Sequence, residues 1–311
     1  MSLTASVLIA LLPAALLIAL GYGLRRAGFI ADDFWPQAER LCYYVLLPAL
    51  FIHGLATADL RAVPVWGLAG AVIAATTVVS AVIIAVRPLM RVDGAAFTSI
   101  FQGGVRFNNY VGVTLAVGVL GAPGVALAAI CNAAIVPTVN LLCVLVFARF
   151  GATRLNGWRV LRQIAQNPLI LACGVGMTLQ AGGVGLPPGV DQALRALGAA
   201  SMPLGLLCVG AALSFSAART WFGPVLIASG FKLFVMPAAA VAASAAFGLT
   251  DSAALTALLF LSLPTASSSY ILARQLGGDA PLMAGVTASQ TLLAAVTIPL
   301  VVSVAAWSGV L

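Results

Sequence analysis

The sequence predicts an all-α integral membrane protein in which ten transmembrane helices form two inverted five-helix repeats. Three observations carry this prediction. Of the 311 residues, 62% are hydrophobic and only 7% are charged, whereas a soluble domain carries about 25% charged residues. Basic residues concentrate in alternate loops between apolar segments, and Gly and Pro recur at one spacing in the two halves. We therefore expect lipid to surround most of the chain.

The individual helices follow from the length of the apolar runs. A helix that crosses a bilayer needs about 20 mostly apolar residues. A basic pair, Arg25–Arg26, follows the first run instead of preceding it, which favours a spanning helix over a cleaved signal. The ten predicted segments are 3–23, 38–57, 65–86, 95–119, 123–148, 167–185, 192–214, 223–247, 252–273 and 281–307.

The loops between these segments predict the orientation, because cytoplasmic loops carry an excess of Lys and Arg. Eleven arginines lie in odd-numbered loops and two in even-numbered loops. We therefore expect a multi-pass protein of the bacterial inner (cytoplasmic) membrane with both termini periplasmic. The eleven are Arg25, Arg26, Arg40, Arg87, Arg91, Arg149, Arg154, Arg159, Arg162, Arg219 and Arg274; the two are Arg61 and Arg195.

The chain also divides into matching halves. Residues 1–148 form the first predicted repeat, 149–166 a cytoplasmic linker and 167–311 the second repeat. Because each half has an odd number of spans, the halves insert in opposite orientations, as in alternating-access transporters, whose substrate sites lie where interrupted helices meet. The matched pairs are Pro13 and Pro168, Gly21 and Gly176, Gly28 and Gly183, Pro48 and Pro203 at an offset of 155, and Leu120–Gly121 with Leu276–Gly277 at 156.

The fourth helix of each half carries the residues that interrupt helices. Glycine and asparagine weaken a helix, and proline removes a backbone donor. A break exposes a half-helix N-terminus, which favours an anion. The alternative is that these polar groups only hold neighbouring helices together. The residues are Gly103, Gly104, Arg106, Asn108, Asn109 and Gly112 in the first half, and Pro264, Thr265, Ser267, Ser268 and Ser269 in the second.

Two cations, Arg106 and Lys232, fall near the predicted bilayer centre, where a charge costs roughly 2.5–3.5 kcal/mol on insertion scales. All eight acidic residues fall in loops or at helix ends, so we expect no counter-ion for either cation inside the membrane. Arg106 is the stronger candidate for contact with a ligand, because it lies inside a break. Alternatively, each cation binds backbone carbonyls and is structural. Lys232, Asn132, Gln290 and His53 are candidate supporting residues.

Other classes of function fit the sequence poorly. The basic residues are scattered between apolar runs, which argues against nucleic-acid binding despite a net charge of +7. We expect no enzyme and no cofactor, because the helices lack paired aspartates and the chain lacks phosphate-binding or dinucleotide-binding motifs. The five cysteines lie in apolar runs without metal-ligand spacing, so we expect buried packing residues and no metal site.

Several stretches resemble the auxin efflux carrier family, whose prokaryotic members include malate and malonate transporters. In order along the chain they are VLLPALFIHGL, RFNNYVG, QNPLI, MPLGLLCVGAAL, FKLFVMP and LPTASSSYILARQLGGD. The family is similar in fold to the bile acid:sodium symporters. The resemblance implies a scaffold part, a mobile transport part, and a crossing of broken helices 4 and 9 at the substrate site. By position it places Asn108 and Asn109 at that crossing, together with Pro264, Ser267 and Ser268.

The chain also departs from this family. Many members have proline at the position of Thr114 and asparagine at that of Ser268, and the acidic sodium ligands of the bile acid relatives have no match. We therefore expect a secondary carrier of a small organic anion, such as a mono- or dicarboxylate, that works in efflux. A sodium- or proton-coupled symporter, a channel and an assembly protein are the alternatives. The expected partners are the anion, the lipid bilayer and a second copy in a homodimer.

Overall fold

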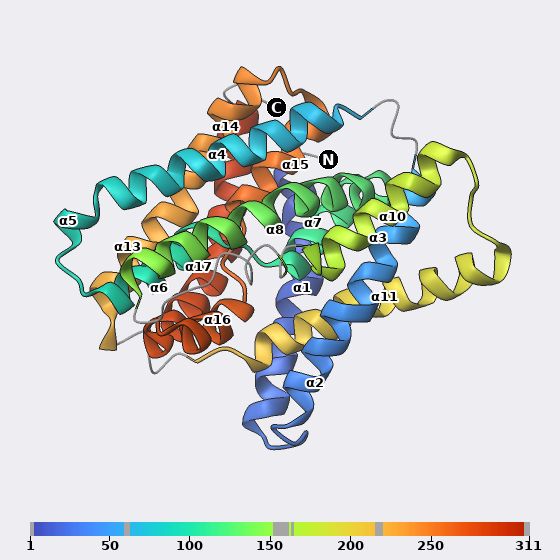
Figure 1. The fold of residues 1–311 in the computed structure, drawn as a ribbon. Coiled ribbons are helices and arrows are strands. Elements are labelled where there is room, and N and C mark those ends of the chain that lie inside the picture. Colours follow the sequence, from blue (N-terminus) through green and yellow to red (C-terminus); the bar gives the residue numbers. More distant parts are fainter. Residues whose placement is uncertain (1–2, 59–62, 152–161, 163–164, 215–219, 308–311) are drawn as a thin grey trace.

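The computed structural model describes residues 3–58, 63–151, 162, 165–214 and 220–307, and every regular element among them is helical (Figure 1). The helices are α1 (Leu3–Arg26), α2 (Phe34–Leu41), η1 (Cys42–Leu46), α3 (Leu47–Ala56), α4 (Val65–Ala85), α5 (Arg87–Met90), α6 (Gly94–Val105), α7 (Asn109–Leu120), α8 (Ala122–Phe150), α10 (Pro168–Gly182), α11 (Pro188–Ala211), α13 (Phe222–Gly230), η3 (Phe231–Val235), α14 (Met236–Ala246), α15 (Asp251–Ser262), α16 (Ser268–Leu276) and α17 (Ala280–Trp307).

Each of the ten predicted segments falls on helix in the structure. Within the described residues, six helical spans are long and apolar enough to cross a membrane, which makes the chain an all-α, multi-pass membrane protein. Of the other four predicted segments, the fourth, sixth and ninth contain short or interrupted helices, and the second lies in a continuous helix that includes the polar residues of α2. The six are Leu3–Arg26, Val65–Ala85, Ala122–Phe150, Pro188–Ala211, Phe222–Ala246 and Ala280–Trp307.

The second and eighth segments are continuous but contain a wider π-helical turn, η1 and η3. Each turn ends two residues before a proline, Pro48 or Pro237. Proline lacks an N–H, and its ring crowds the carbonyl four residues earlier. A wider turn relieves this crowding without ending the helix.

The helix of the second segment begins at Phe34, earlier than predicted. The polar residues of α2 lower the hydropathy of this first part of the helix, so the apolar run begins later than the helix does.

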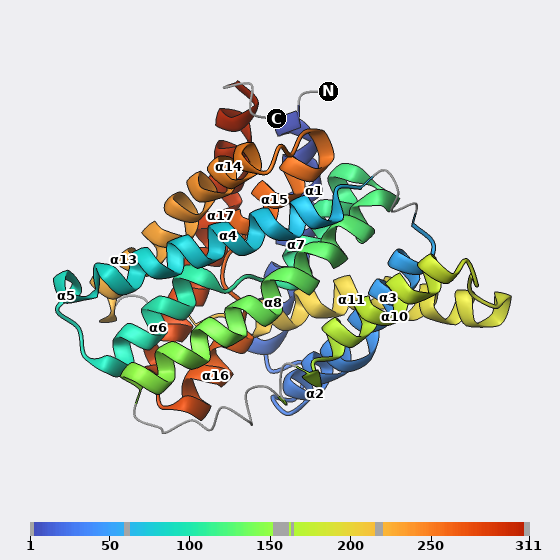
Figure 2. The ribbon, with the colours of Figure 1, turned by 45° about the horizontal axis from the view of Figure 1, so that its top comes forward.

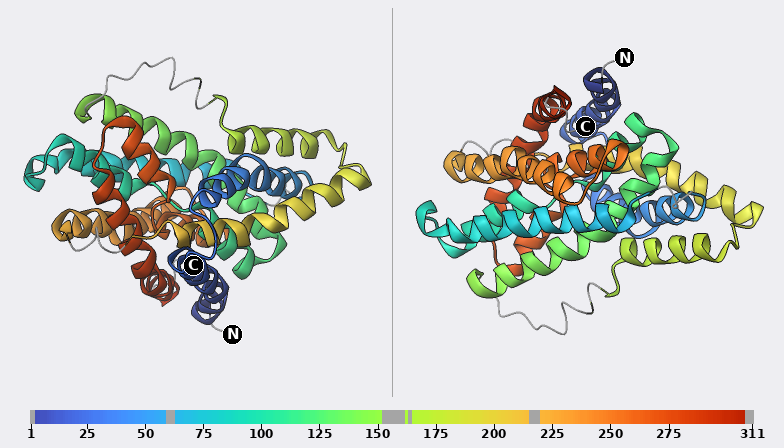
Figure 3. Two further views of the ribbon diagram at one scale, coloured as in Figure 1. Left: turned by 90° about the horizontal axis from the view of Figure 1, so that it is seen from below. Right: turned by 90° about the horizontal axis from the view of Figure 1, so that it is seen from above.

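The helices gather into two groups, which we call the small and the large bundle (Figures 1 and 2). The small bundle consists of α1, α2, η1, α3, α10 and α11, and the large bundle of the remaining helices. In Figure 3 the small-bundle helices α3, α10 and α11 extend to one side, whereas α4, α8 and α13 to α14 extend to the other. The bundles meet mainly where α1 packs on α7 and α17 and where α3 packs on α8.

Two glycines allow close packing inside the small bundle. A Cβ atom on Gly21 would lie 2.1 Å from the Leu207 carbonyl oxygen, so α1 packs directly on the α11 backbone. A Cβ atom on Gly176 would lie 3.1 Å from the Ile52 carbonyl oxygen, at the contact of α10 with α3. The residue numbers in these two contacts are related by the offset of 155.

Helix ends next to the odd-numbered loops contact one another. The Arg25 guanidinium donates to the Ala211 carbonyl at 2.7 Å, and the Asp279 N–H donates to the Ala95 carbonyl at 3.2 Å. The guanidinium of Arg87 lies 4.4 Å from the Phe150 ring centroid. Elsewhere, the Thr4 and Ser303 hydroxyls are 2.8 Å apart, so the start of α1 lies beside the end of α17.

Candidate functional site

The first helix break lies between α6 and α7, where Arg106, Phe107 and Asn108 connect the two half-helices. The Asn108 side chain accepts from the N–H groups of Tyr110 and Val111 and so caps α7. Such a cap satisfies donors that a helix start otherwise leaves unpaired. The Asn108 N–H donates to the Pro264 carbonyl at 2.9 Å. The two predicted breaks therefore meet directly.

The second break runs from Leu263 to Ser267, between α15 and α16. The side chain of Gln290, from α17, connects the last turn of α6 to the second break. Its amide nitrogen donates to the Gly103 carbonyl at the end of α6 at 3.0 Å, and its amide oxygen accepts from the Thr265 N–H at 2.9 Å. Gln290 is thus a positioning residue for the crossing.

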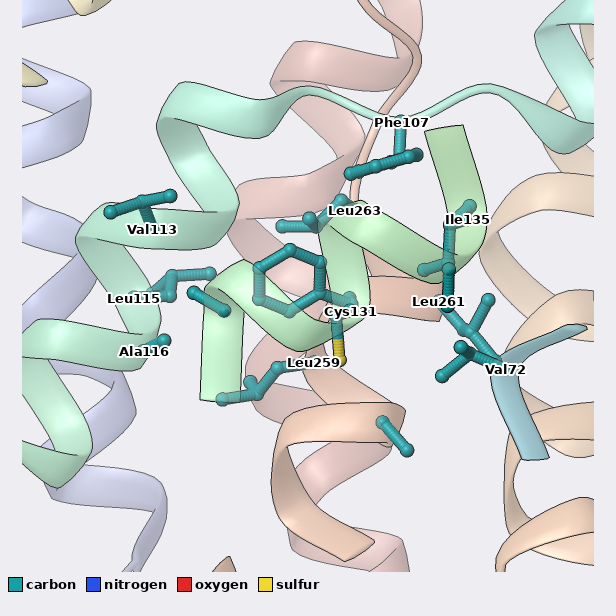
Figure 4. Close-up of a cluster of buried hydrophobic side chains, with 14 of the residues drawn as sticks. Val72, Phe107, Val113, Leu115, Ala116, Cys131, Ile135, Leu259, Leu261 and Leu263 are labelled. Carbon is teal, nitrogen blue, oxygen red and sulfur yellow. The ribbon is translucent and has the colours of Figure 1, made fainter. Parts of the chain in front are cut away.

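Apolar packing holds the crossing from one side. Figure 4 shows Phe107 and Leu263, one from each break, above a cluster contributed by α4, α7, α8 and α15. The ring centroids of Phe107 and Phe260 are 5.9 Å apart. A Cβ atom on Gly112 would lie 2.6 Å from Leu263 Cδ1, so a larger residue would push α7 away from the second break. Gly112 therefore supports the crossing by being small.

On the other side of the crossing, a cavity of about 790 Å³ opens between the two bundles. Arg106, Asn108, Asn109, Ser267 and Ser268 all contribute to its wall. The cavity volume falls within the roughly 300–1,000 Å³ of typical small-molecule sites. The structure thus brings these five predicted residues, from both halves, to one cavity, whereas Thr265 is buried and shares a hydrogen bond with Ser269.

Arg106 spans this cavity wall. Its Nη1 donates to Asn140 Oδ1 at 3.0 Å and its Nη2 to Ser268 Oγ at 3.4 Å. Both partners are neutral, so neither of them cancels the charge. Within the described residues, Arg106 Nε, Asn108 Nδ2 and Asn109 Oδ1 are buried without a hydrogen-bond partner. Buried polar atoms without partners are uncommon and costly in folded proteins, so these three atoms mark the break as a locally strained, polar part of the interior.

The charges around the cavity favour an anion. Arg40 and Arg162 line it together with Arg106, and Glu39 is the carboxylate on the described wall. Three positive charges against one negative charge leave an excess of positive charge. Arginine also presents a planar fork of donors that matches a carboxylate. The site is therefore chemically suited to a small organic anion.

Glu39 was not anticipated at this site. Its Oε1 accepts from Ser267 Oγ at 2.8 Å, which brings a carboxylate from the end of α2 beside the second break. Its position at a helix end was predicted correctly. What the sequence did not reveal is that α2 packs beside the second break.

The remaining predicted residues lie elsewhere. Lys232, in η3, is fully buried, and its Nζ has no hydrogen-bond partner in the described part of the chain. The described residues therefore show no contact between Lys232 and a backbone carbonyl, which was its alternative predicted role.

Asn132 donates to the Ala128 carbonyl within α8. His53 Nε2 lies 3.1 Å from Asp191 Oδ1, between α3 and α11. Of the four supporting candidates, Gln290 is the one that connects the last turn of α6 to the second break.

Together, the apolar spans, the crossed broken helices and the cavity between two bundles define a polytopic membrane transport protein. The profile of the family described as "Membrane transport protein" matches residues 6–302. The chain belongs to this family, the auxin efflux carrier and malate transporter-like family that its motifs resemble. A protein from Methanothermobacter thermautotrophicus, named "Uncharacterized transporter", is 24% identical over 298 residues, covering 95% of each chain.

Proposed function

We propose that this protein is a secondary carrier that moves a small organic anion, such as a mono- or dicarboxylate, by alternating access. The observation that carries the proposal is the cavity at the crossing, whose wall contains Arg106, held by the neutral Asn140 and Ser268, together with Asn108 and Asn109. A carboxylate would accept hydrogen bonds from the guanidinium groups on the cavity wall and offset the charge of the surrounding arginines. Substrate contacts would come from Arg106, Asn108, Asn109 and the hydroxyls of α16.

The proposed architecture is ten spanning helices in two inverted repeats. It is supported by two equivalent contacts, Gly21 with Leu207 and Gly176 with Ile52. An offset of 155 relates Gly21 to Gly176 and Ile52 to Leu207, so each contact pairs one residue from each half. It is supported again by glycines with positive φ at matching positions. They are Gly28 and Gly183, with φ of 64° and 62°, and Gly121 and Gly277, with φ of 67° and 74°. Two halves with one fold and opposite insertion provide alternating access by exchanging conformations.

The proposed orientation places the odd-numbered loops in the cytoplasm of a bacterial inner membrane. Arg40 and Arg162, from predicted cytoplasmic loops, line the cavity near Arg106. With this orientation, the cavity faces the cytoplasm. An anion leaving a cell gains about 2.3 kcal/mol per charge for each 100 mV of inside-negative potential. We therefore propose efflux as the working direction.

Binding is the first test of the proposal. Purified protein is screened by thermal shift against malate, malonate, succinate and monocarboxylates, with the corresponding amines as controls. A ligand at a hundred times its dissociation constant adds about 2.7 kcal/mol of stability, so a specific anion should raise the unfolding temperature measurably. Stabilisation by the amines and by none of the anions would contradict the assignment of an anion site.

A further inference from the structure

Glu39 connects the two bundles at the edge of the cavity. It lies in the last turn of α2, in the small bundle, and accepts a hydrogen bond from Ser267, which precedes α16 in the large bundle. Ser267 occupies the capping position of α16, but its side chain does not cap that helix. A serine at this position usually accepts from the first N–H groups of the helix. Here the hydroxyl donates to a carboxylate across the bundle interface instead.

Glu39 and Ser267 also line a second cavity, of about 670 Å³. Several groups that can carry charge face Glu39 or the two cavities. They are Cys42, Tyr43 and Tyr44 of η1, Cys208 of α11, Tyr110 of α7, Tyr270 and Arg274 of α16, Arg25 of α1, Arg40 of α2, Asp32 before α2, Arg106 in the first break, and Arg162.

Most of these groups keep one charge state at mild pH. Arginine stays protonated, while tyrosine and cysteine are ordinarily neutral. Asp32 is exposed and pairs with Arg25 at 2.9 Å. Glu39 is the carboxylate beside the crossing, so it is the group best placed to change charge when an anion arrives.

We propose that Glu39 binds a proton when the anion binds, so that the carrier moves one proton with each anion. This inference rests on the proposed function and names its coupling ion. An anion in the cavity places a second negative charge near the Glu39 carboxylate, and a like charge favours the protonated form. The proton comes from the solution on the side where the anion enters. It forms an O–H bond at Glu39 and dissociates when the anion leaves.

Protonation would also loosen the contact between the bundles. A hydroxyl binds an ionised carboxylate more strongly than it binds a carboxylic acid. Loading the anion thus weakens the Glu39–Ser267 link, which alternating access must break in each cycle. With a proton, a dicarboxylate dianion carries one net negative charge instead of two. The inside-negative potential then still drives export, with half the gain per anion.

The test is calorimetric titration of the purified protein in buffers of different ionisation enthalpy, across mildly acidic to mildly alkaline pH. The probe is whichever of malate, malonate and succinate binds the parent most tightly. We expect proton uptake approaching one per anion, and an affinity that rises by up to tenfold for each unit that the pH falls. Glu39→Gln should retain binding while losing both effects. Asp32→Asn, a matched change of an exposed carboxylate, should keep both.

A second variant covers the case in which Glu39→Gln does not fold. Ser267→Ala removes a donor to the ionised carboxylate, so proton uptake should extend to higher pH than in the parent. The inference is overturned if the parent binds the anion without proton uptake, if Glu39→Gln takes up as many protons as the parent, or if Ser267→Ala leaves the pH dependence unchanged. If the parent binds none of the three anions, the proposed function itself fails, and this shows before any variant is made.

Discussion

Arg106 carries the electrostatic part of the proposed function at the scale of single residues. Its guanidinium contacts Asn140 and Ser268 and keeps Nε without a partner among the described residues. Hydrogen bonds to charged groups contribute about 1.5–3 kcal/mol each. Arg106→Gln should therefore weaken dicarboxylate binding by roughly 10- to 100-fold and leave the fold intact. Calorimetric titration measures the change.

Two further variants sharpen this prediction. Arg106→Lys keeps the charge but loses the planar fork, so its affinity should fall between those of the parent and Arg106→Gln. Arg26→Gln removes an exposed arginine that contacts Tyr22 outside the cavity, and it should bind like the parent. Parental affinity in Arg106→Gln would show that Arg106 is structural.

Gln290 makes a separate prediction, about stability. Replacing it with leucine leaves the Gly103 carbonyl and the Thr265 N–H without their partner. Each buried group left unsatisfied costs about 1–3 kcal/mol. Gln290→Leu should therefore lower the unfolding temperature and weaken anion binding together, because the crossing loses its link. Unfolding in detergent followed by fluorescence tests this, and an unchanged unfolding temperature would refute the positioning role.

At the scale of helices, packing of α1 on α11 depends on the absence of a side chain at Gly21. Overpacking a tight contact typically costs 1–3 kcal/mol, so Gly21→Ala should destabilise the protein by at least this much. Gly23 provides a matched control in the same helix, because a Cβ atom there would have nothing within 4 Å. Gly23→Ala should be neutral or slightly stabilising. Thermal unfolding measures the stability of both variants, and equal stability of Gly21→Ala and Gly23→Ala would contradict the close α1–α11 contact.

The helix breaks show how far the sequence predicts this site. Gly103, Asn108 and Pro264 disrupt helices locally, so their pattern located both interruptions correctly. Glu39 escaped prediction because its contact with Ser267 depends on how α2 packs against residues more than 200 positions away. The local amino-acid composition around Glu39 does not predict such a long-range contact. Likewise, Gln290 was a supporting candidate, but its two specific partners follow only from the tertiary structure.

At the scale of the whole molecule, the proposed inverted architecture predicts a definite topology. Reporter fusions after Ala152, in the linker between the halves, and after Gly189, at the start of α11, should report opposite sides of the membrane. The first should be cytoplasmic and the second periplasmic, because the arginine-rich loops stay inside. Ala152 lies outside the described residues, so the fusion tests the topology independently of the structure. Signals from the same side would rule out two inverted halves.

The most direct test of the central claim is counterflow in proteoliposomes. Vesicles containing the purified parent protein are loaded with unlabelled dicarboxylate and diluted into labelled dicarboxylate. A carrier whose anion site lies at the crossing of its broken helices should transiently accumulate label, and Arg106→Gln should strongly reduce this accumulation at dicarboxylate concentrations that saturate the parent. A channel gives no such accumulation, and an assembly protein gives no flux. Accumulation by Arg106→Gln equal to that of the parent, or accumulation of organic cations in place of anions, would contradict the proposed anion site.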